Sequence, residues 1–156
     1  MKIKPNYIII PLITIATALL GSYFTNLGMP WYNETLIQPD LTPPKIAFPI
    51  AWNLIFLATT ISALIIWKKG KKHENFPLII GLFLFNAALN AFWCYLFFTA
   101  HLIQASFVEM IILETTLVLL ITLSWRISRP ASLLLLPYLL WVGLASYLTF
   151  QIFMLN

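Results

Sequence analysis

The sequence predicts an all-α membrane protein, a bundle of five transmembrane helices with a long lid loop between helices 1 and 2. Hydrophobic residues make up 61% of the 156 residues and charged residues only 9%, whereas a soluble domain is about 45–50% apolar and about 25% charged. Several apolar runs reach the ~20 residues that a helix needs to cross the hydrocarbon. These runs are continuous rather than alternating, which excludes a β-barrel.

Five segments meet this length requirement, and together they form one membrane domain over residues 1–156. The expected helices cover about 6–26, 46–67, 76–99, 103–125 and 131–154. The basic start and apolar run of the N-terminus are typical of a signal peptide. No small-residue cleavage site follows them, so this segment is interpreted as the retained first span.

The connections between the expected helices differ in length and polarity. The run KKGKKHEN separates the second and third spans and is the most polar stretch of the chain. Only a few residues around Ala100–Leu102 separate the third and fourth spans, which predicts an antiparallel pair. Arg126 and Arg129 flank a short turn, and Pro130 starts the fifth span.

The first connection is the long interruption of this apolar sequence. It runs from Trp31 to Trp52 and reads WYNETLIQPDLTPPKIAFPIAW. Pro39, Pro43 and Pro44 stiffen its backbone, and far fewer residues would join two consecutive spans. The stretch is therefore predicted to be a lid over a site in the bundle.

Charge predicts the orientation of the chain in the membrane. With five spans, eight of the nine Lys and Arg fall on one side, namely Lys2, Lys4, Lys68, Lys69, Lys71, Lys72, Arg126 and Arg129. Only Lys45 falls on the other side. Because basic residues in short loops stay in the cytoplasm, the N-terminus is expected on the cytoplasmic side, and the membrane is expected to be the cytoplasmic membrane of a prokaryote. The same bias explains the net charge of +4, so no nucleic-acid partner is expected.

Three of the expected helices carry stripes of aromatic and polar residues at helical spacing. The stripes are Phe48, Trp52, Phe56 and Thr59; Asn86, Asn90, Trp93 and Phe97; and Tyr138, Trp141, Ala145 and Leu148. Such stripes can enclose a flat apolar ligand that bears a few polar groups, or they can pack helix against helix. The two asparagines likewise suit either interhelical hydrogen bonds or contacts with a ligand.

The remaining titratable residues give weaker signals. Glu109 and Glu114 lie inside the fourth span, where acids are costly and often functional. Their spacing puts them on different faces; Glu109 alternatively has a structural or interfacial role, and Glu114 is unexplained. His73 and His101 fall on opposite sides of the membrane, so no metal site is expected. Cys94 is the only cysteine and forms no disulfide within the chain.

Sequence motifs of conventional enzymes are missing. The chain contains no HExxH, CxxC, GxSxG or P-loop, so a hydrolase or an ATP-driven pump is not expected. The number of spans is compatible with a transporter. However, no pair of spans shows the repeat symmetry that many transporters have.

Four blocks of the sequence together resemble a known family. They are the stretch Trp31–Trp52, LNAFWCYLFF, AHLIQASFVE and LLPYLLWVGLASYL, in that order. They resemble the tryptophan-rich sensory protein/translocator protein family (TspO/MBR, peripheral-type benzodiazepine receptor), from about Trp31 to the C-terminus. The resemblance implies a five-helix membrane protein, commonly a homodimer in lipid. It also implies protoporphyrin IX or heme as a ligand, with no obligatory cofactor.

The resemblance also implies which residues contact the ligand. By motif position they are Tyr32, Pro43, Trp52, Phe56, Asn90, Trp93, Trp141 and Ala145. Leu41 departs from the family, because many members have a tryptophan shortly before the paired prolines. No basic residue follows Tyr147, as it does in the sterol motif of animal members, so sterol binding is not expected.

The expected function is that of a membrane receptor, sensor or scavenger of tetrapyrroles. An enzymatic alternative is light- and oxygen-dependent degradation of porphyrin, in which the resemblance implicates Trp52 and Trp141. Transport of porphyrin or another small solute is the third possibility.

Overall fold

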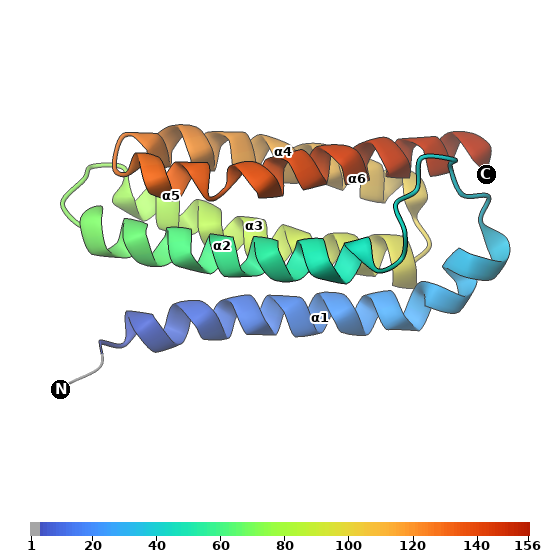
Figure 1. The fold of residues 1–156 in the computed structure, drawn as a ribbon, viewed down its shortest axis with the longest axis horizontal. Helices are drawn as coiled ribbons and strands as arrows, with labels where there is room; N and C mark the ends of the chain where they lie inside the picture. The colour runs from blue at the N-terminus through green and yellow to red at the C-terminus, as the bar shows by residue number, and fades with distance from the viewer. Residues whose placement is uncertain (1–3) are drawn as a thin grey trace.

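The computed structural model describes residues 4–156, and in that range five helical segments are long and apolar enough to cross a membrane (Figure 1). The main helices are α1 (Asn6–Thr35), α2 (Ala47–Lys69), α3 (Phe76–Cys94), α4 (Ile103–Trp125) and α6 (Leu136–Leu155). A π-helical turn, η1 (Tyr95–Thr99), continues α3, and the short helix α5 (Arg129–Leu133) precedes α6. The predicted fold class is confirmed, and the chain is an integral membrane protein.

The helices pack as a closed ring around the bundle axis. Helix α1 packs on α2 and α3, α3 packs on α4, and α4 packs on α6. Contacts of α2 with α5 and α6 close the ring. Figure 1 shows α1 along one side of the bundle, with α4 and α6 on the far side.

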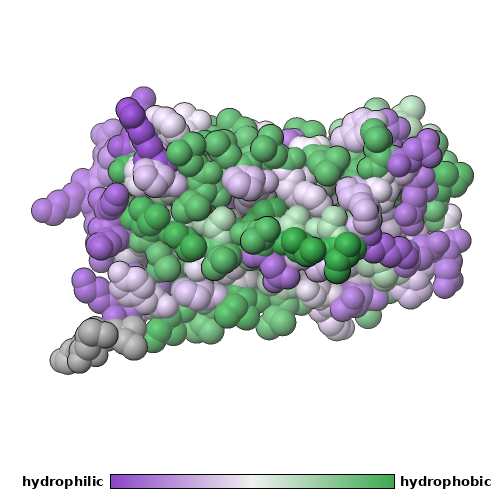
Figure 2. Space-filling model, in the orientation of Figure 1, coloured by the Kyte–Doolittle hydropathy of each residue, from purple (hydrophilic) through white to green (hydrophobic). Residues whose placement is uncertain are grey.

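The surface of the bundle is suited to lipid rather than water. Large apolar side chains point outward along its length; Leu19 on α1 and Leu140 on α6, for example, are 66% and 75% exposed. Small polar side chains lie inside, including the fully buried Ser106 and Ser124 of α4. In Figure 2, hydrophilic residues gather at the two ends, and hydrophobic surface spreads over the middle.

The first helix is longer than the sequence predicted. Its expected end near residue 26 is wrong, because α1 continues without a break to Thr35. Pro30 lies inside this extension; in lipid, neighbouring helices and local adjustment make an internal proline tolerable. The aromatic start of the expected lid, Trp31 and Tyr32, is therefore the last turns of a helix and not part of a loop.

The connection that remains, residues 36–46, is held by several side-chain hydrogen bonds. Asn156 at the C-terminus brackets Ile37, since its side chain accepts from the Ile37 N–H (2.9 Å) and donates to the Ile37 carbonyl (3.1 Å). The Lys45 ammonium donates to Asn33 Oδ1 of α1 (3.0 Å), and the Thr42 hydroxyl donates to the Pro39 carbonyl (2.6 Å). The connection thus lies over the end of α6.

Gly28 sets the closest approach between α1 and the end of the third span. A Cβ atom at this position would lie 1.8 Å from the carbonyl oxygen of Phe98 in η1. Only glycine fits, as at many close helix crossings in membranes. Nearby, the rings of Trp31 and His101 stack with their centroids 4.0 Å apart, which joins α1 to the turn before α4.

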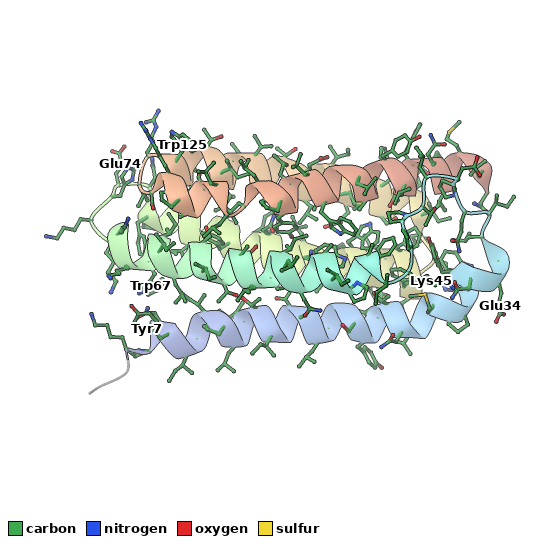
Figure 3. The ribbon with its side chains drawn as sticks, in the orientation of Figure 1. Tyr7, Glu34, Lys45, Trp67, Glu74 and Trp125 are labelled. Atoms are coloured by element: carbon green, nitrogen blue, oxygen red, sulfur yellow. The ribbon has the colours of Figure 1, made fainter. Side chains whose placement is uncertain are left out.

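The two ends of the bundle carry different charges. Figure 3 places Trp67 and Trp125 near one end, and Glu34 and Lys45 near the other. At the first end, Lys71 Nζ lies 5.7 Å from the Trp67 ring centroid, and the Arg129 guanidinium carbon lies equally far from that of Trp125. We call this end the basic end. Lys2, one of the eight basic residues counted above, lies outside the described residues.

Candidate ligand-binding site

An aromatic cluster with one polar pair lies between α2, α3 and α6. The Trp52 ring contacts Phe56 one turn later (centroids 5.7 Å apart) and Tyr138 of α6 (6.0 Å). The Asn90 amide of α3 donates to the Tyr138 hydroxyl at 3.0 Å. Helical spacing on three different helices thus brings Trp52, Phe56 and Asn90 around the buried Tyr138. We call these four residues the central cluster.

A second group of rings connects the central part of α3 to the end of α1. The rings of Trp93 and Phe97 stack with their centroids 5.3 Å apart. Tyr32 lies against Phe97 and Phe98, with ring centroids 6.0 and 5.8 Å apart. Trp93 packs against two clusters of buried residues, a main core that includes Tyr138 and a smaller core of Phe97, Phe98 and Ile152. It therefore bridges Tyr32 and the interior.

Trp141 lies one turn after Tyr138 on α6. Its ring meets Phe48 of α2 edge to face, with centroids 5.6 Å apart. Ala145 follows on the same stripe, half-buried, and both residues pack against the main core. Pro43 is half-buried in the connection between α1 and α2, outside the ring contacts described here.

Several buried polar groups near these rings have no hydrogen-bond partner among the described residues. The indole N–H groups of Trp93 and Trp141 are two of them, and the two carboxyl oxygens of Glu109 are two more. Glu109 is only 4% exposed, so it does not reach the surface. Buried polar groups in proteins are nearly always paired, and unpaired donors on two helices therefore call for an explanation.

The two asparagines of α3 form hydrogen bonds to different helices. Asn86 donates to Thr116 Oγ1 of α4 at 3.0 Å and to the Leu113 carbonyl at 3.4 Å. Asn86 is thus an interhelical hydrogen-bonding residue, which is one of the two interpretations of the sequence. Asn90 bonds across to Tyr138 of α6, and both asparagines line a small cavity of about 30 Å³ together with Phe56 and Tyr138.

A much larger cavity, of about 520 Å³, opens at the basic end between α1, α2 and α3. Thr14, Thr59, Phe83 and Ala87 line both cavities, so the larger one leads toward the central cluster. The roomy space thus lies toward the end of the bundle opposite the connection between α1 and α2.

Sequence reasoning omitted some of the residues that line these spaces. Tyr138 was named in the stripe on the fifth span but was not predicted to contact the ligand. Its spacing of three residues from Trp141 could have indicated that it lies on the same face of the helix. Thr14 and Thr17 of α1 also line the small cavity. Nothing in the apolar first span distinguished them, because their position depends on how α1 packs. Glu114 is half-buried, and its Oε1 would lie 3.2 Å from a Cβ at Gly143; the missing side chain of Gly143 leaves room for it.

Comparison with known proteins supplies the family. The model of the TspO/MBR family matches residues 8–155. The chain belongs to the TspO/MBR family. It is 36% identical over 142 residues to the tryptophan-rich protein TspO of Chlorobaculum tepidum, covering 91% of this chain and 90% of the relative. It is 34% identical to the protein of the same name from Archaeoglobus fulgidus, covering 93% of each.

Similarity extends to an animal protein. The chain is 30% identical over 136 residues to the translocator protein of Ovis aries, covering 86% of this chain and 79% of the relative. The predicted TspO/MBR resemblance is therefore confirmed, and it includes α1 as well as the blocks from Trp31 onward. Within residues 4–156, no group of three or more His, Cys, Asp or Glu side chains is arranged to hold a metal ion.

Proposed function

We propose that this TspO/MBR protein is a membrane receptor or scavenger of tetrapyrroles such as protoporphyrin IX or heme. The observation that carries the proposal is the pair of buried, unpaired indole N–H groups of Trp93 and Trp141. They lie on two helices that also supply the Asn90–Tyr138 pair. A flat apolar ligand with acceptor atoms would satisfy these donors and stack on the surrounding rings.

Binding on this scheme requires the bundle to open. The cavity at the central cluster is about 30 Å³, far below the ~300–1,000 Å³ of typical ligand pockets. Of the five spans, α1 has the smallest share of buried residues: 11% of its most apolar stretch is buried, against 39% for α4 and for the last span. The element that would move is the first half of α1, which supplies Thr14 and Thr17 to the wall of this cavity and borders the larger space of about 520 Å³.

Light-dependent porphyrin degradation is a second candidate activity. Trp52 and Tyr138, two oxidisable rings, lie in edge contact within the central cluster. A porphyrin bound against them and excited in the presence of oxygen would meet side chains that can lose an electron. Trp52 and Trp141 are the residues proposed for this chemistry.

The homodimer that the family resemblance implies stays a prediction.

We also propose that the N-terminus faces the cytoplasm of a prokaryotic cell. The described basic residues of the loops, Lys45 excepted, lie at or next to one end of the bundle, and such a bias marks the cytoplasmic side. The test is labelling with an impermeant thiol reagent in a Cys94→Ala background. Asn33→Cys should label from outside intact cells and Lys71→Cys should not; the reverse pattern would refute the orientation.

The ligand proposal is tested by titrating protoporphyrin IX into purified protein and following porphyrin fluorescence. Trp141→Phe removes the unpaired N–H and keeps most of the ring, so affinity should fall about tenfold, the loss of roughly one hydrogen bond. Trp125→Phe is the matched control, because Trp125 lies at the basic end away from the cluster. Equal affinities in the three proteins would show that the indole N–H does not contact the porphyrin.

A further inference from the structure

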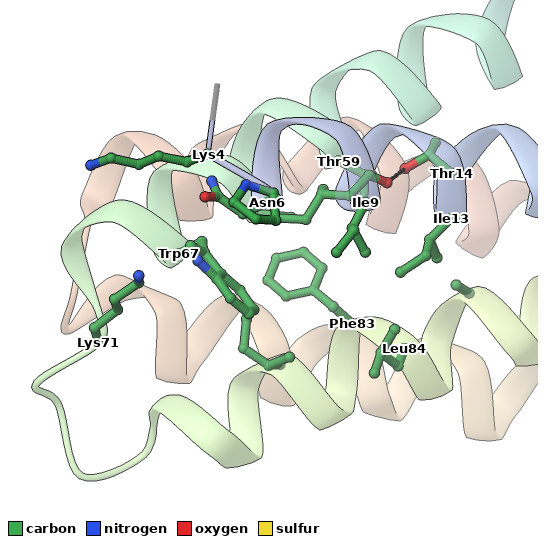
Figure 4. Close-up of a pocket in the computed structure, with 15 residues that line it drawn as sticks. Lys4, Asn6, Ile9, Ile13, Thr14, Thr59, Trp67, Lys71, Phe83 and Leu84 are labelled. Carbon is green, nitrogen blue, oxygen red and sulfur yellow. Dashed lines mark hydrogen bonds between the residues drawn. The ribbon is translucent and has the colours of Figure 1, made fainter. Parts of the chain in front are cut away.

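The large cavity at the basic end has the shape of a lipid-facing groove, which we call the basal groove (Figure 4). Its walls are aliphatic and aromatic side chains of three helices, such as Ile9 and Ile13 of α1, Ala63 of α2, and Phe83 and Leu84 of α3. Its volume of about 520 Å³ lies in the range of ligand pockets. None of the residues assigned above to the tetrapyrrole site lines it.

The mouth of the basal groove is basic. Lys4 precedes α1 and Lys71 follows α2, and both are exposed lining residues. Trp67 stands between them in the lining, with the Lys71 ammonium 5.7 Å from its ring centroid. Figure 4 shows Lys4 and Lys71 on the side of the groove where Trp67 lies, away from Ile13 and Thr14. Among residues 4–156, no aspartate or glutamate lines the groove, so an anion at the mouth meets the two lysines and no acidic side chain of this range.

The depth of the groove matches one leaflet of a bilayer. Its α1 wall runs from Asn6 to Thr14, about 12 Å along a helix at about 1.5 Å per residue. One leaflet contributes about half of a ~30 Å hydrocarbon core. A chain that enters at the lysines would therefore end near Thr14, where the groove meets the small central cavity.

We propose that the basal groove binds an anionic glycerophospholipid, such as phosphatidylglycerol, of the leaflet at the basic end. One acyl chain lies along Ile9, Ile13 and Leu84, and the phosphate lies between the ammonium groups of Lys4 and Lys71. Basic pockets between transmembrane helices are suited to acidic headgroups. Phosphatidylcholine is disfavoured, because its own quaternary ammonium would face the two lysines.

The position of the chain end gives this lipid a route to influence the ligand site. Thr59 and Phe83 line both the basal groove and the small cavity beside Asn90. A lipid chain in the groove therefore touches one side of a wall whose other side faces the central cluster. The lipid site itself does not depend on whether the protein binds tetrapyrroles.

The test uses the full chain purified in a neutral detergent and probed with phosphatidylglycerol and with phosphatidylcholine of the same acyl chains. Bound lipid is counted by native mass spectrometry across a titration. One phosphatidylglycerol should bind more tightly than the rest, and phosphatidylcholine should show no such first site. The double variant Lys4→Gln/Lys71→Gln should weaken this site by about fivefold per lysine, or ~25-fold.

The matched control is Lys69→Gln/Lys72→Gln, which removes the same charge at the same end from residues that do not line the groove. It should keep the tight site within about twofold. Equal loss in the two double variants would overturn the proposal in favour of general attraction to the basic end. So would equal binding of the two lipids by the wild-type protein.

A second variant tests the groove rather than its charge. Ile13 is a half-buried lining residue, so Ile13→Trp places an indole in the groove without removing a buried core residue. The tight phosphatidylglycerol site should be lost although both lysines remain. If this variant binds the lipid as the wild type does, the acyl chain lies elsewhere and the proposal fails.

Discussion

The two halves of α1 pack differently, and this difference separates a closed aromatic site from an open groove. In its second half, Gly28 lets the helix touch the backbone of η1, and Gly21 has only the Cys94 sulfur within contact range of an added Cβ, at 3.4 Å. In its first half, Ile9, Ile10 and Ile13 line the 520 Å³ basal groove. Small residues allow close helix packing in lipid, where hydrophobicity alone does not drive helices together. Side-chain size along one helix thus decides where the bundle is closed.

Four changes test this comparison, and the largest effect is expected at the close crossing. Gly28→Leu would force a side chain into the Phe98 carbonyl, because even a Cβ there lies at 1.8 Å. The variant should lose about 3 kcal/mol of stability, at the upper end for overpacking. Thermal unfolding in detergent measures it.

Gly81→Ala is the control for the glycine argument. Gly81 is an exposed residue of α3, and a Cβ there would have no atom within 4 Å. This variant should unfold at or slightly above the wild-type temperature, since alanine favours a helix over glycine by up to ~1 kcal/mol. Similar behaviour of the two variants would show that α1 does not depend on the close crossing.

The next change tests whether the aromatic site only binds porphyrin or also degrades it. Trp52→Phe and Trp141→Phe keep most of the apolar contact but have rings that are much harder to oxidise. Both should bleach bound protoporphyrin IX under light at least about tenfold more slowly, or 1.4 kcal/mol in barrier. The Soret band is followed against a dark control and against Trp125→Phe. Bleaching at the wild-type rate would leave the two indoles as walls of the site.

A smaller effect is expected from filling the space beside Trp141. Ala145 is half-buried one turn beyond it on α6, so Ala145→Leu should intrude on the ligand and weaken protoporphyrin binding by about tenfold, the cost of moderate overpacking. The unfolding temperature should change little, because Ala145 is not fully enclosed. A large drop in that temperature with normal binding by the folded fraction would make Ala145 a packing contact.

The smallest effect is expected in the connection between α1 and α2. Replacing Pro43 and Pro44 with glycine loosens residues 36–46, so more order must be imposed when the site closes over a ligand. Two such changes, at about 0.4–1 kcal/mol each, should weaken tetrapyrrole binding by about fivefold and leave the fold intact. The hydrogen bonds of Asn156 to Ile37 still hold the connection. Unchanged affinity would mean that these residues only connect the helices.

The sequence by itself determined the features that depend on local hydropathy. Spans two to four were predicted to within a few residues, since each is a long apolar run bounded by polar or turn residues. The bias of Lys and Arg toward one side, and the spacing that aligns Trp52 with Phe56, are likewise readable along the chain. The blocks around Trp52, Asn90 and Trp141 were enough to predict the family.

Only the tertiary structure decided how these helices share space. The sequence placed the end of the first span near residue 26, whereas α1 ends at Thr35. The helix continues because Trp31 and Tyr32 gain ring contacts with His101 and Phe97. The partner of Asn86 on α4 and the depth of the basal groove were equally unpredictable. Such features depend on the sizes of side chains that come into contact from different helices, and these contacts cannot be predicted from a local sequence pattern.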